Sequence, residues 1–224
     1  MRFLDWLLPQ HCYLCAKSSL SAVCPDCIQA LPYQQVACPR CGRATRHARL
    51  CTHCRHQPPL FKHTRAVLRY LAPVDQLIHA AKYQHDFRML AVLADIMQQH
   101  FEQNPPPLPE VLMPVPLHPV RQWGRGYNQS YILAQKLAQH FNLPLDYRSC
   151  CRVKNTEQQA RLRSREARHS NVYEAFAYFP PYPAWQHVAL IDDVFSTGST
   201  LNEITRVLLA GGVRRVDIWC CARR

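Results

Sequence analysis

Apolar residues recur with two periods along the chain, and together they predict alternating strands and helices. Short apolar runs and alternations predict strands at 64–71, 111–115, 145–151, 188–191 and 215–221. Apolar residues at helical spacing predict helices at 73–82, 87–101, 127–141 and 201–209. Strands that alternate with helices are typical of a parallel sheet covered by helices, so the predicted fold class is α/β.

The stretch 188–200 reads VALIDDVFSTGST and joins a predicted strand to a predicted helix through a hydroxyl-rich loop. We expect the strand to end at its fourth apolar residue, directly before Asp192 and Asp193. In the loop 196–200, Gly198 lets the backbone approach an anion closely, and the amides at a helix N-terminus attract it. Paired carboxylates beside such a phosphate cradle suit a sugar phosphate. An acidic strand end followed by an ordinary Ser/Thr helix cap is the simpler alternative.

Eight cysteines form four C-x-x-C pairs near the N-terminus, and each pair offers two thiolates to one tetrahedral metal ion. Sequential pairing gives two sites, Cys12, Cys15, Cys24 and Cys27 in one and Cys38, Cys41, Cys51 and Cys54 in the other. The spacing also allows an interleaved pairing. Four thiolates with no open position indicate structural zinc rather than a catalytic metal. An iron–sulfur cluster and a disulfide-rich secreted module are the alternatives, although no secretion signal is evident.

The composition separates a small N-terminal module from a larger domain and makes the chain basic. The cysteine pairs end at residue 54 and a Pro-Pro linker follows, which predicts modules at 1–58 and 61–224. The net charge of +12 suits polyanions such as nucleic acid or phosphorylated substrates. The basic segment 152–168 fits a catalytic loop, a nucleic-acid contact or a solvated loop. Apolar runs stay well short of the ~20 residues that span a bilayer, so we expect no membrane partner. The stretch 1–9 is too short and too acidic for a secretion signal, so we expect a cytoplasmic protein.

The stretch 188–200 resembles the phosphoribosyl-pyrophosphate (PRPP) signature of type I phosphoribosyltransferases. That signature has four apolar residues, two acids, two variable residues, a Ser or Thr, and then Thr-Gly-x-Thr, and this chain matches every position. The resemblance implies that Asp192 and Asp193 face the ribose 2′- and 3′-hydroxyls. It also implies that the 5′-phosphate is held by Ser196, Thr197, Gly198, Ser199 and Thr200.

Further segments make nearly the whole chain similar to the ComF family, also called ComFC or GntX. Lys82 and Tyr83 match part of its Leu-Lys-Tyr segment, with Ala81 in place of the Leu. Residues 115–117 and 125–129 match its Val-Pro and Arg-Gly-Phe-Asn-Gln signatures, with Tyr replacing the Phe. The segment 156–176 matches its Thr-x-x-Gln-x-x-Leu, Arg-x-x-Asn and Phe pattern. Members of this family join an N-terminal zinc module to a domain of the type I phosphoribosyltransferase fold, and they are linked to natural competence and the use of external DNA.

Cations should surround a leaving pyrophosphate, because negative charge develops on it as its bond to ribose breaks. We therefore expect Mg²⁺ to accompany PRPP, with Arg125 and Lys82 near the pyrophosphate and Arg121 behind them. Each of these cations is also compatible with a solvated surface position. The expected catalytic groups are Asp192, Asp193 and Arg125. The other expected PRPP or phosphate ligands are Lys82, Val115, Gly126 and the five loop residues 196–200.

Three functions fit these features. The first is a transferase that binds PRPP or ribose 5-phosphate with Mg²⁺, whose acceptor no base-specific segment identifies. The second is a factor that handles single-stranded DNA, in which the transferase site is regulatory or vestigial. In the third, the zinc ribbons dock a DNA-uptake helicase or a recombination protein.

Overall fold

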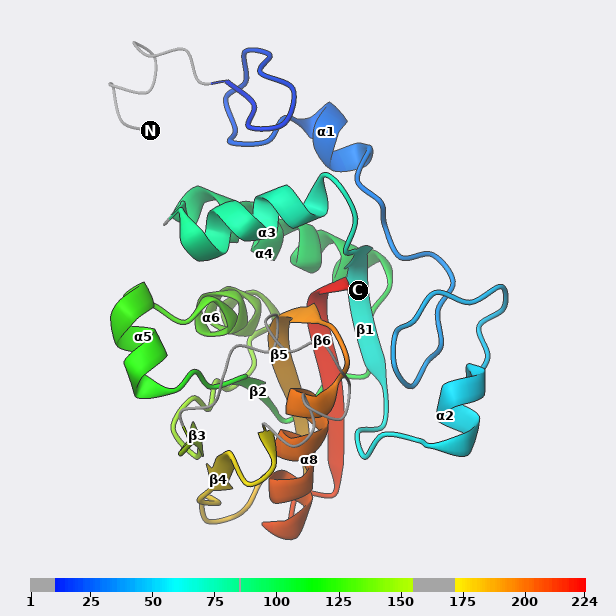
Figure 1. Ribbon diagram of the computed structural model, residues 1–224, viewed down its shortest axis with the longest axis vertical. Helices are drawn as coiled ribbons and strands as arrows, with labels where there is room; N and C mark the ends of the chain where they lie inside the picture. Colours follow the sequence, from blue (N-terminus) through cyan, green and yellow to red (C-terminus); the bar gives the residue numbers. More distant parts are fainter. Residues whose placement is uncertain (1–10, 85, 155–171) are drawn as a thin grey trace.

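A parallel four-stranded sheet forms the centre of the computed structural model, which describes residues 11–84, 86–154 and 172–224 (Figure 1). The strands lie in the order β1-β6-β5-β2, and each neighbouring pair is parallel. Their bounds are β1 Thr64–Arg69, β2 Val111–Pro114, β5 His187–Phe195 and β6 Arg215–Arg223. The predicted α/β class with a parallel sheet is confirmed.

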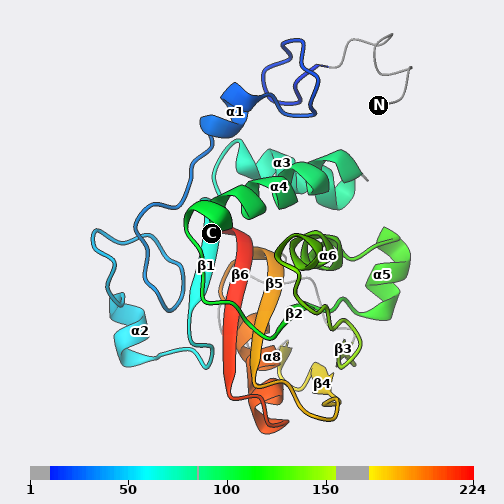
Figure 2. The same cartoon turned by 180° about the vertical axis from the view of Figure 1, so that it is seen from behind.

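Helices cover both faces of this sheet, which explains why its central strands are buried along most of their length. Figures 1 and 2 show α8 (Ser199–Ala210) on one face and α4 (Phe87–Gln103) with α6 (Gln129–Phe141) on the other. The helix α3 (Val74–Tyr83) packs against α4. Within the described ranges, no helix is both long and apolar enough to cross a membrane.

The cysteine-rich region contributes to two separate hydrophobic cores. Cys12 and Val23 are buried with residues of α3 and α4, whereas Cys38 and Phe61 are buried with residues of α8. The short helices α1 (Pro25–Gln29) and α2 (Thr52–His56) mark the two halves of this region, with α1 near α3 and α2 beside β1 (Figures 1 and 2). The second half therefore packs toward the side of the sheet where the 196–200 loop enters α8.

The strand predicted at 145–151 is wrong. Leu145 makes a single bridge to Leu112, and the chain next forms β3 (Cys150–Arg152), which pairs antiparallel with β4 (Phe176–Tyr178) in a separate small sheet. The hydrogen bonds of Asp146 with the amides of residues 148 and 149 turn the backbone between these two pairings.

The segment after β2 contains a short helix α5 (Pro119–Arg125), which the apolar periodicity did not predict. Proline at the first helical position and the His118 ring, which accepts from the Val120 amide at 3.3 Å, favour this start. Gly126 ends the helix in the left-handed conformation, with φ +79°. Most of the basic segment 152–168, and the family pattern at 156–171, lie outside the described residues.

Candidate phosphate-binding site and metal centres

Two clusters of four cysteines gather the sequential pairs. Within each cluster the ligand sulfurs lie within 4.8 Å of one another, and the clusters comprise Cys12, Cys15, Cys24, Cys27 and Cys38, Cys41, Cys51, Cys54. The Sγ–Sγ distances of Cys15–Cys24 and Cys41–Cys51 are both 3.7 Å. Four sulfurs about 2.3 Å from a tetrahedral zinc ion are about 3.8 Å apart, so the clusters fit Zn²⁺. All twelve cysteines of the chain lie in the described ranges, and none of them forms a disulfide there.

Backbone amides prepare one thiolate in each cluster. The amide of Cys24 donates to Cys12 Sγ, and that of Cys51 to Cys38 Sγ, both at 3.3 Å. Burial acts to raise the pKa of Cys12 and Cys38, but these and neighbouring amides outweigh it and lower the pKa to about 6 and about 7, respectively. Hydrogen bonds from neighbouring thiols raise the pKa of Cys27 to about 12. A bound cation is thus needed to hold all four sulfurs as thiolates.

The loop between β5 and α8 is shaped by Gly198. This residue is the N-cap of α8 and has a left-handed φ of +85°. A Cβ here would come 2.7 Å from the Phe195 ring, so the position requires glycine for both reasons. The hydroxyls of Thr197 and Ser199 lie 3.1 Å apart at the first turn of the helix. The loop therefore brings hydroxyls and helix N-terminal amides together, as a phosphate site requires.

The carboxylates lie inside β5, because this strand continues to Phe195 instead of ending before them. Pairing with β6 extends past Asp192, which lies opposite Cys220, so the expected strand end was wrong. Asp192 Oδ1 accepts from the Ser130 hydroxyl at 3.1 Å and from the backbone amide of Asp193 at 3.0 Å. The sheet and α6 thus fix the position of this carboxylate.

Asp193 forms an ion pair with Lys82 in the interior of the site. Lys82 Nζ lies 2.9 Å from Asp193 Oδ2, and Asp193 is 5% exposed. Burial and the charge of Asp193 raise the pKa of Asp192 to about 7. Burial alone would lower the pKa of Lys82, but the two carboxylates outweigh it, so its pKa lies above the ordinary value. Lys82 therefore stays charged, while Asp192 titrates near neutrality.

A cavity of about 250 Å³, which we call the carboxylate cavity, joins these groups to the loop. Its lining includes the predicted residues Lys82, Val115, Asp192, Asp193, Ser196, Thr197, Gly198, Ser199 and Thr200. Among the described residues, Arg125 and Gly126 do not line it. The Arg125 guanidinium lies 5.4 Å from the centre of the Tyr83 ring, which is itself part of the lining.

Two residues that follow α5, Tyr127 and Asn128, hold the backbone around the cavity in place. Asn128 Nδ2 donates to the Val115 carbonyl at 3.0 Å, and the Tyr127 hydroxyl donates to the Ala81 carbonyl. These contacts fix the loop after β2 and the end of α3, which carries the neighbouring Lys82. We did not predict from the sequence that Ser130 would contact Asp192. Its position near the start of a predicted helix, directly after the Arg-Gly-Tyr-Asn-Gln motif, was a usable signal.

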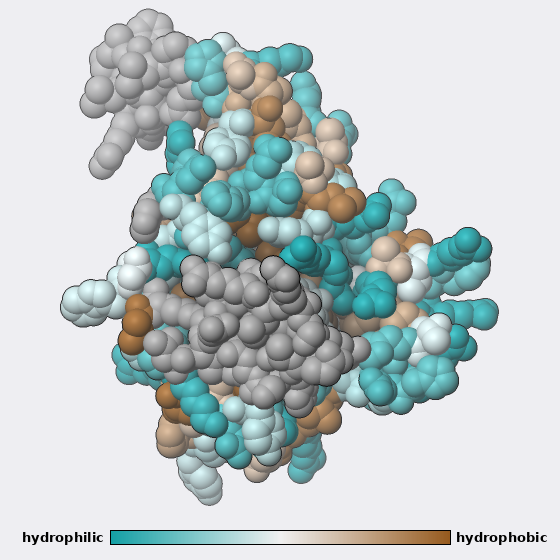
Figure 3. Space-filling view, viewed as in Figure 1, coloured by the Kyte–Doolittle hydropathy of each residue, from teal (hydrophilic) through white to brown (hydrophobic). Residues whose placement is uncertain are grey.

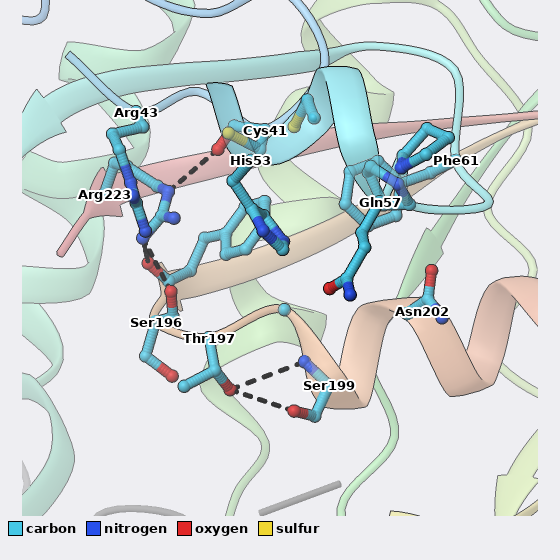
Figure 4. A pocket seen from close by; sticks show the side chains of 15 residues that line it. Cys41, Arg43, His53, Gln57, Phe61, Ser196, Thr197, Ser199, Asn202 and Arg223 are labelled. Carbon is cyan, nitrogen blue, oxygen red and sulfur yellow. Dashed lines mark hydrogen bonds between the residues drawn. The ribbon is translucent and has the colours of Figure 1, made fainter. Parts of the chain in front are cut away.

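Arg223 is the second functional residue that the sequence did not reveal. It is buried, and its guanidinium donates to the carbonyls of Cys41 at 2.8 Å, Phe195 at 3.0 Å and Ser196 at 2.6 Å. An Arg-Arg C-terminus reads as a solvated tail, so the sequence held no signal for this role. The residue joins the second metal cluster to the start of the loop 196–200 (Figure 4).

Comparisons with known proteins agree with both parts of this architecture. Residues 3–55 match the model of the double zinc ribbon domain. The chain is 34% identical over 224 residues to the DNA utilization protein YhgH of Salmonella typhi, which covers 96% of this chain and 98% of that protein. It is 34% identical over 219 residues to competence protein F of Haemophilus influenzae, covering 93% and 92% of the two chains. It is 25% identical over 181 residues to competence protein ComFC of Bacillus subtilis, covering 78% and 72%. The full-length similarity, together with two four-cysteine centres ahead of a parallel sheet, shows that the chain belongs to the ComF family.

Proposed function

We propose that this protein binds PRPP, or a related ribose phosphate, together with Mg²⁺ and acts in DNA uptake or the use of external DNA. One observation carries the ligand: a single cavity joins the Lys82–Asp193 ion pair and Asp192 to the loop 196–200. The relatives named for DNA utilization and for competence support the biological setting. The division into modules at 1–58 and 61–224 remains part of this proposal.

In this proposal the loop, the two carboxylates and the cations each bind a different part of PRPP. The loop 196–200 holds the 5′-phosphate, and Asp192 and Asp193 accept hydrogen bonds from the ribose hydroxyls. Lys82 supplies positive charge, and Arg125, stacked over a residue of the cavity lining, supplies more as pyrophosphate leaves. Mg²⁺ bound with PRPP would neutralise part of the pyrophosphate charge. The protein would then be a phosphoribosyltransferase, with an acceptor still to be identified.

Calorimetric titration of the zinc-loaded protein with PRPP, with and without Mg²⁺, tests the ligand directly. We expect saturable heat with one ligand per chain and weaker binding without Mg²⁺. Absence of binding in both titrations would refute the proposal.

Handling of single-stranded DNA is the second candidate, with the ribose-phosphate site as a regulatory pocket. The net charge of +12 favours it, and Figure 3 shows a largely hydrophilic surface over the region of the second ribbon. It predicts binding of an oligonucleotide that weakens steeply with salt. Charge reversal at Arg161, Arg163, Arg165 and Arg168 should abolish this binding without changing PRPP affinity, if the basic segment is a DNA contact.

Docking of a DNA-uptake helicase or recombination protein by the ribbons is the third candidate. Leu20 is fully exposed in the first ribbon, which makes it a direct probe of that surface. Leu20→Glu should weaken a pull-down of such a partner and leave PRPP binding unchanged. Retention of the partner by this variant would count against docking at that surface.

A further inference from the structure

A second cavity lies between the loop 196–200 and the second zinc ribbon, on the side of the loop away from the carboxylate cavity (Figure 4). We call this loop the phosphate loop, after its proposed ligand. The second cavity has a volume of about 620 Å³, which exceeds that of the carboxylate cavity. We call it the ribbon cavity. Its lining includes Arg43, His53, Gln57 and Phe61 on the ribbon side, and Asn202 and Arg223 on the loop side.

The two cavities share the residues 195–199, so the phosphate loop has an open space on each side. A ribose phosphate that reaches the carboxylates occupies one of these spaces and leaves the other free. The free space has the size of a pocket for a small organic ligand, which is commonly 300–1,000 Å³. A ligand seated there would also reach the backbone and hydroxyls of Ser196 and Thr197.

The lining of the ribbon cavity combines amides, an imidazole and aromatic rings. Figure 4 shows His53 and Gln57 directed from the α2 side toward the loop, with Asn202 opposite on α8. The Phe61 and Phe195 rings meet edge to face, with centroids 5.7 Å apart. The Asn202 Oδ1 already accepts from the Leu60 amide at 2.7 Å, so Asn202 offers its Nδ2 as a donor. The exposed Gln57 side chain can donate and accept in one plane, which suits the edge of a nucleobase, while the buried rings make the floor of the cavity apolar.

The charges of the lining favour a ligand that carries phosphate. Arg43 is exposed on the ribbon side, and Arg223 is buried where it donates to the carbonyls of Cys41 and Ser196. None of the lining residues in the described part of the chain is an Asp or Glu. The ribbon side therefore offers a cation and planar polar groups next to a loop already suited to phosphate.

We infer that the ribbon cavity binds the base of a nucleotide whose phosphate lies on the loop 196–199. The inference rests on the proposed function in one respect, because it uses the same loop as a phosphate site. The nucleotide can be free or part of a strand, since the recognised chemistry is a base joined to a phosphate. Gln57 and the Nδ2 of Asn202 would contact the base edge, and the buried Phe61 ring would form part of the apolar floor.

Titrations with adenosine 5′-monophosphate and with ribose 5-phosphate test this inference on the zinc-loaded full chain. Both ligands offer the same phosphate, but adenosine 5′-monophosphate alone offers a base. We expect it to bind at least tenfold more tightly. Gln57→Trp, which fills the cavity, should remove this difference without changing ribose 5-phosphate affinity. Gln103→Trp, at the exposed end of α4, is the matched control and should preserve the difference in affinity between the two ligands. Equal affinity of the two ligands for the native chain, or a difference that survives in Gln57→Trp, would overturn the inference.

The outcomes separate this inference from the proposed function. If adenosine 5′-monophosphate binds and Gln57→Trp abolishes that binding, while PRPP and ribose 5-phosphate fail to bind, the base site stands and the proposed function fails. If PRPP binds and the adenine base adds no affinity, the proposed function stands and the base site fails. A twelve-residue oligo(dA) that binds tenfold more tightly than the mononucleotide, and is sensitive to Gln57→Trp, identifies a strand as the source. Equal affinity with the same sensitivity identifies a free nucleotide.

Discussion

The Arg223 guanidinium connects the second zinc centre, at Cys41, to the loop 196–200. Its Nε donates to the carbonyl of the metal ligand Cys41 at 2.8 Å, and its Nη1 donates to the Phe195 and Ser196 carbonyls. Its charged plane also lies 4.2 Å from the centre of the Phe195 ring. The shape of the loop at Gly198 depends on that same ring. The ribbon is therefore part of the scaffold of the candidate site, because one side chain holds both.

Loss of the Arg223 hydrogen bonds should make the loop 196–200 less ordered. Arg223→Ala leaves the carbonyls of Cys41 and Ser196 without this donor, at a cost of about 1–3 kcal/mol in the free energy of unfolding per buried unsatisfied group, whereas the Phe195 carbonyl keeps the Arg224 amide. We expect PRPP affinity to fall about tenfold in titration calorimetry. Arg214→Ala removes an exposed arginine just before β6 and should change neither quantity. Native PRPP affinity in Arg223→Ala would show that these hydrogen bonds do not shape the loop.

The two zinc centres should differ in their effect on ligand binding. Cys15→Ser in the first centre and Cys54→Ser in the second should each release one zinc ion, measured by metal analysis of the purified protein. Because Cys41 belongs to the second centre, Cys54→Ser should weaken PRPP binding by tenfold or more. We expect a smaller loss in Cys15→Ser, whose centre packs toward α3 and α4. Equal losses in the two variants would contradict a specific link through Arg223.

The metal centres were predictable because their chemistry is local in sequence. Two C-x-x-C pairs close in sequence can meet without any knowledge of the sheet, and the sequential clusters confirm this. The hydroxyl-rich loop 196–200 was equally local, and its phosphate ligand stays a prediction. Its Gly198 and hydroxyls lie within five residues, and the structure places them at one helix start.

The contacts between distant segments could not be derived from periodicity. Lys82 meets Asp193 across 111 positions of sequence, and Arg223 meets Cys41 across 182. Only the parallel order of the sheet brings these residues together. The end of β5 was misplaced for a related reason, since polar residues can continue a strand where a partner strand supplies hydrogen bonds and Ser130 satisfies the carboxylate.

The carboxylate pair should control affinity for the ribose. Asp192→Asn combined with Asp193→Asn removes two charged acceptors and leaves Lys82 without its partner, so we expect PRPP affinity to fall more than tenfold, about 1.4 kcal/mol or more. Titration calorimetry at constant Mg²⁺ measures the change. Asp95→Asn, on the exposed side of α4, is the matched control and should bind normally. Unchanged affinity in the double variant would remove these residues from the site.

Stability and binding should respond to pH in opposite directions through Asp192. Its pKa is raised by burial and by Asp193 to about 7, whereas an unfolded aspartate titrates near pH 4. Between these values the folded protein holds a proton that the unfolded chain has lost. The contribution of Asp192 to the free energy of unfolding therefore falls as pH rises from about 4 to about 7. Ligand affinity should instead increase as pH rises through 7, because ribose hydroxyls donate better to the carboxylate than to the acid.

Denaturant unfolding and PRPP titration at pH 6 and pH 8 measure these two trends. Part of any change in binding comes from the 5′-phosphate, whose second pKa is about 6. Asp192→Asn isolates the contribution of the carboxyl group, since the amide does not titrate. The variant should lose less stability than the native chain between pH 6 and pH 8, and its PRPP affinity should rise less. The same pH dependence in both proteins would mean that Asp192 is already ionised at pH 6, with Lys82 compensating its charge as well as that of Asp193.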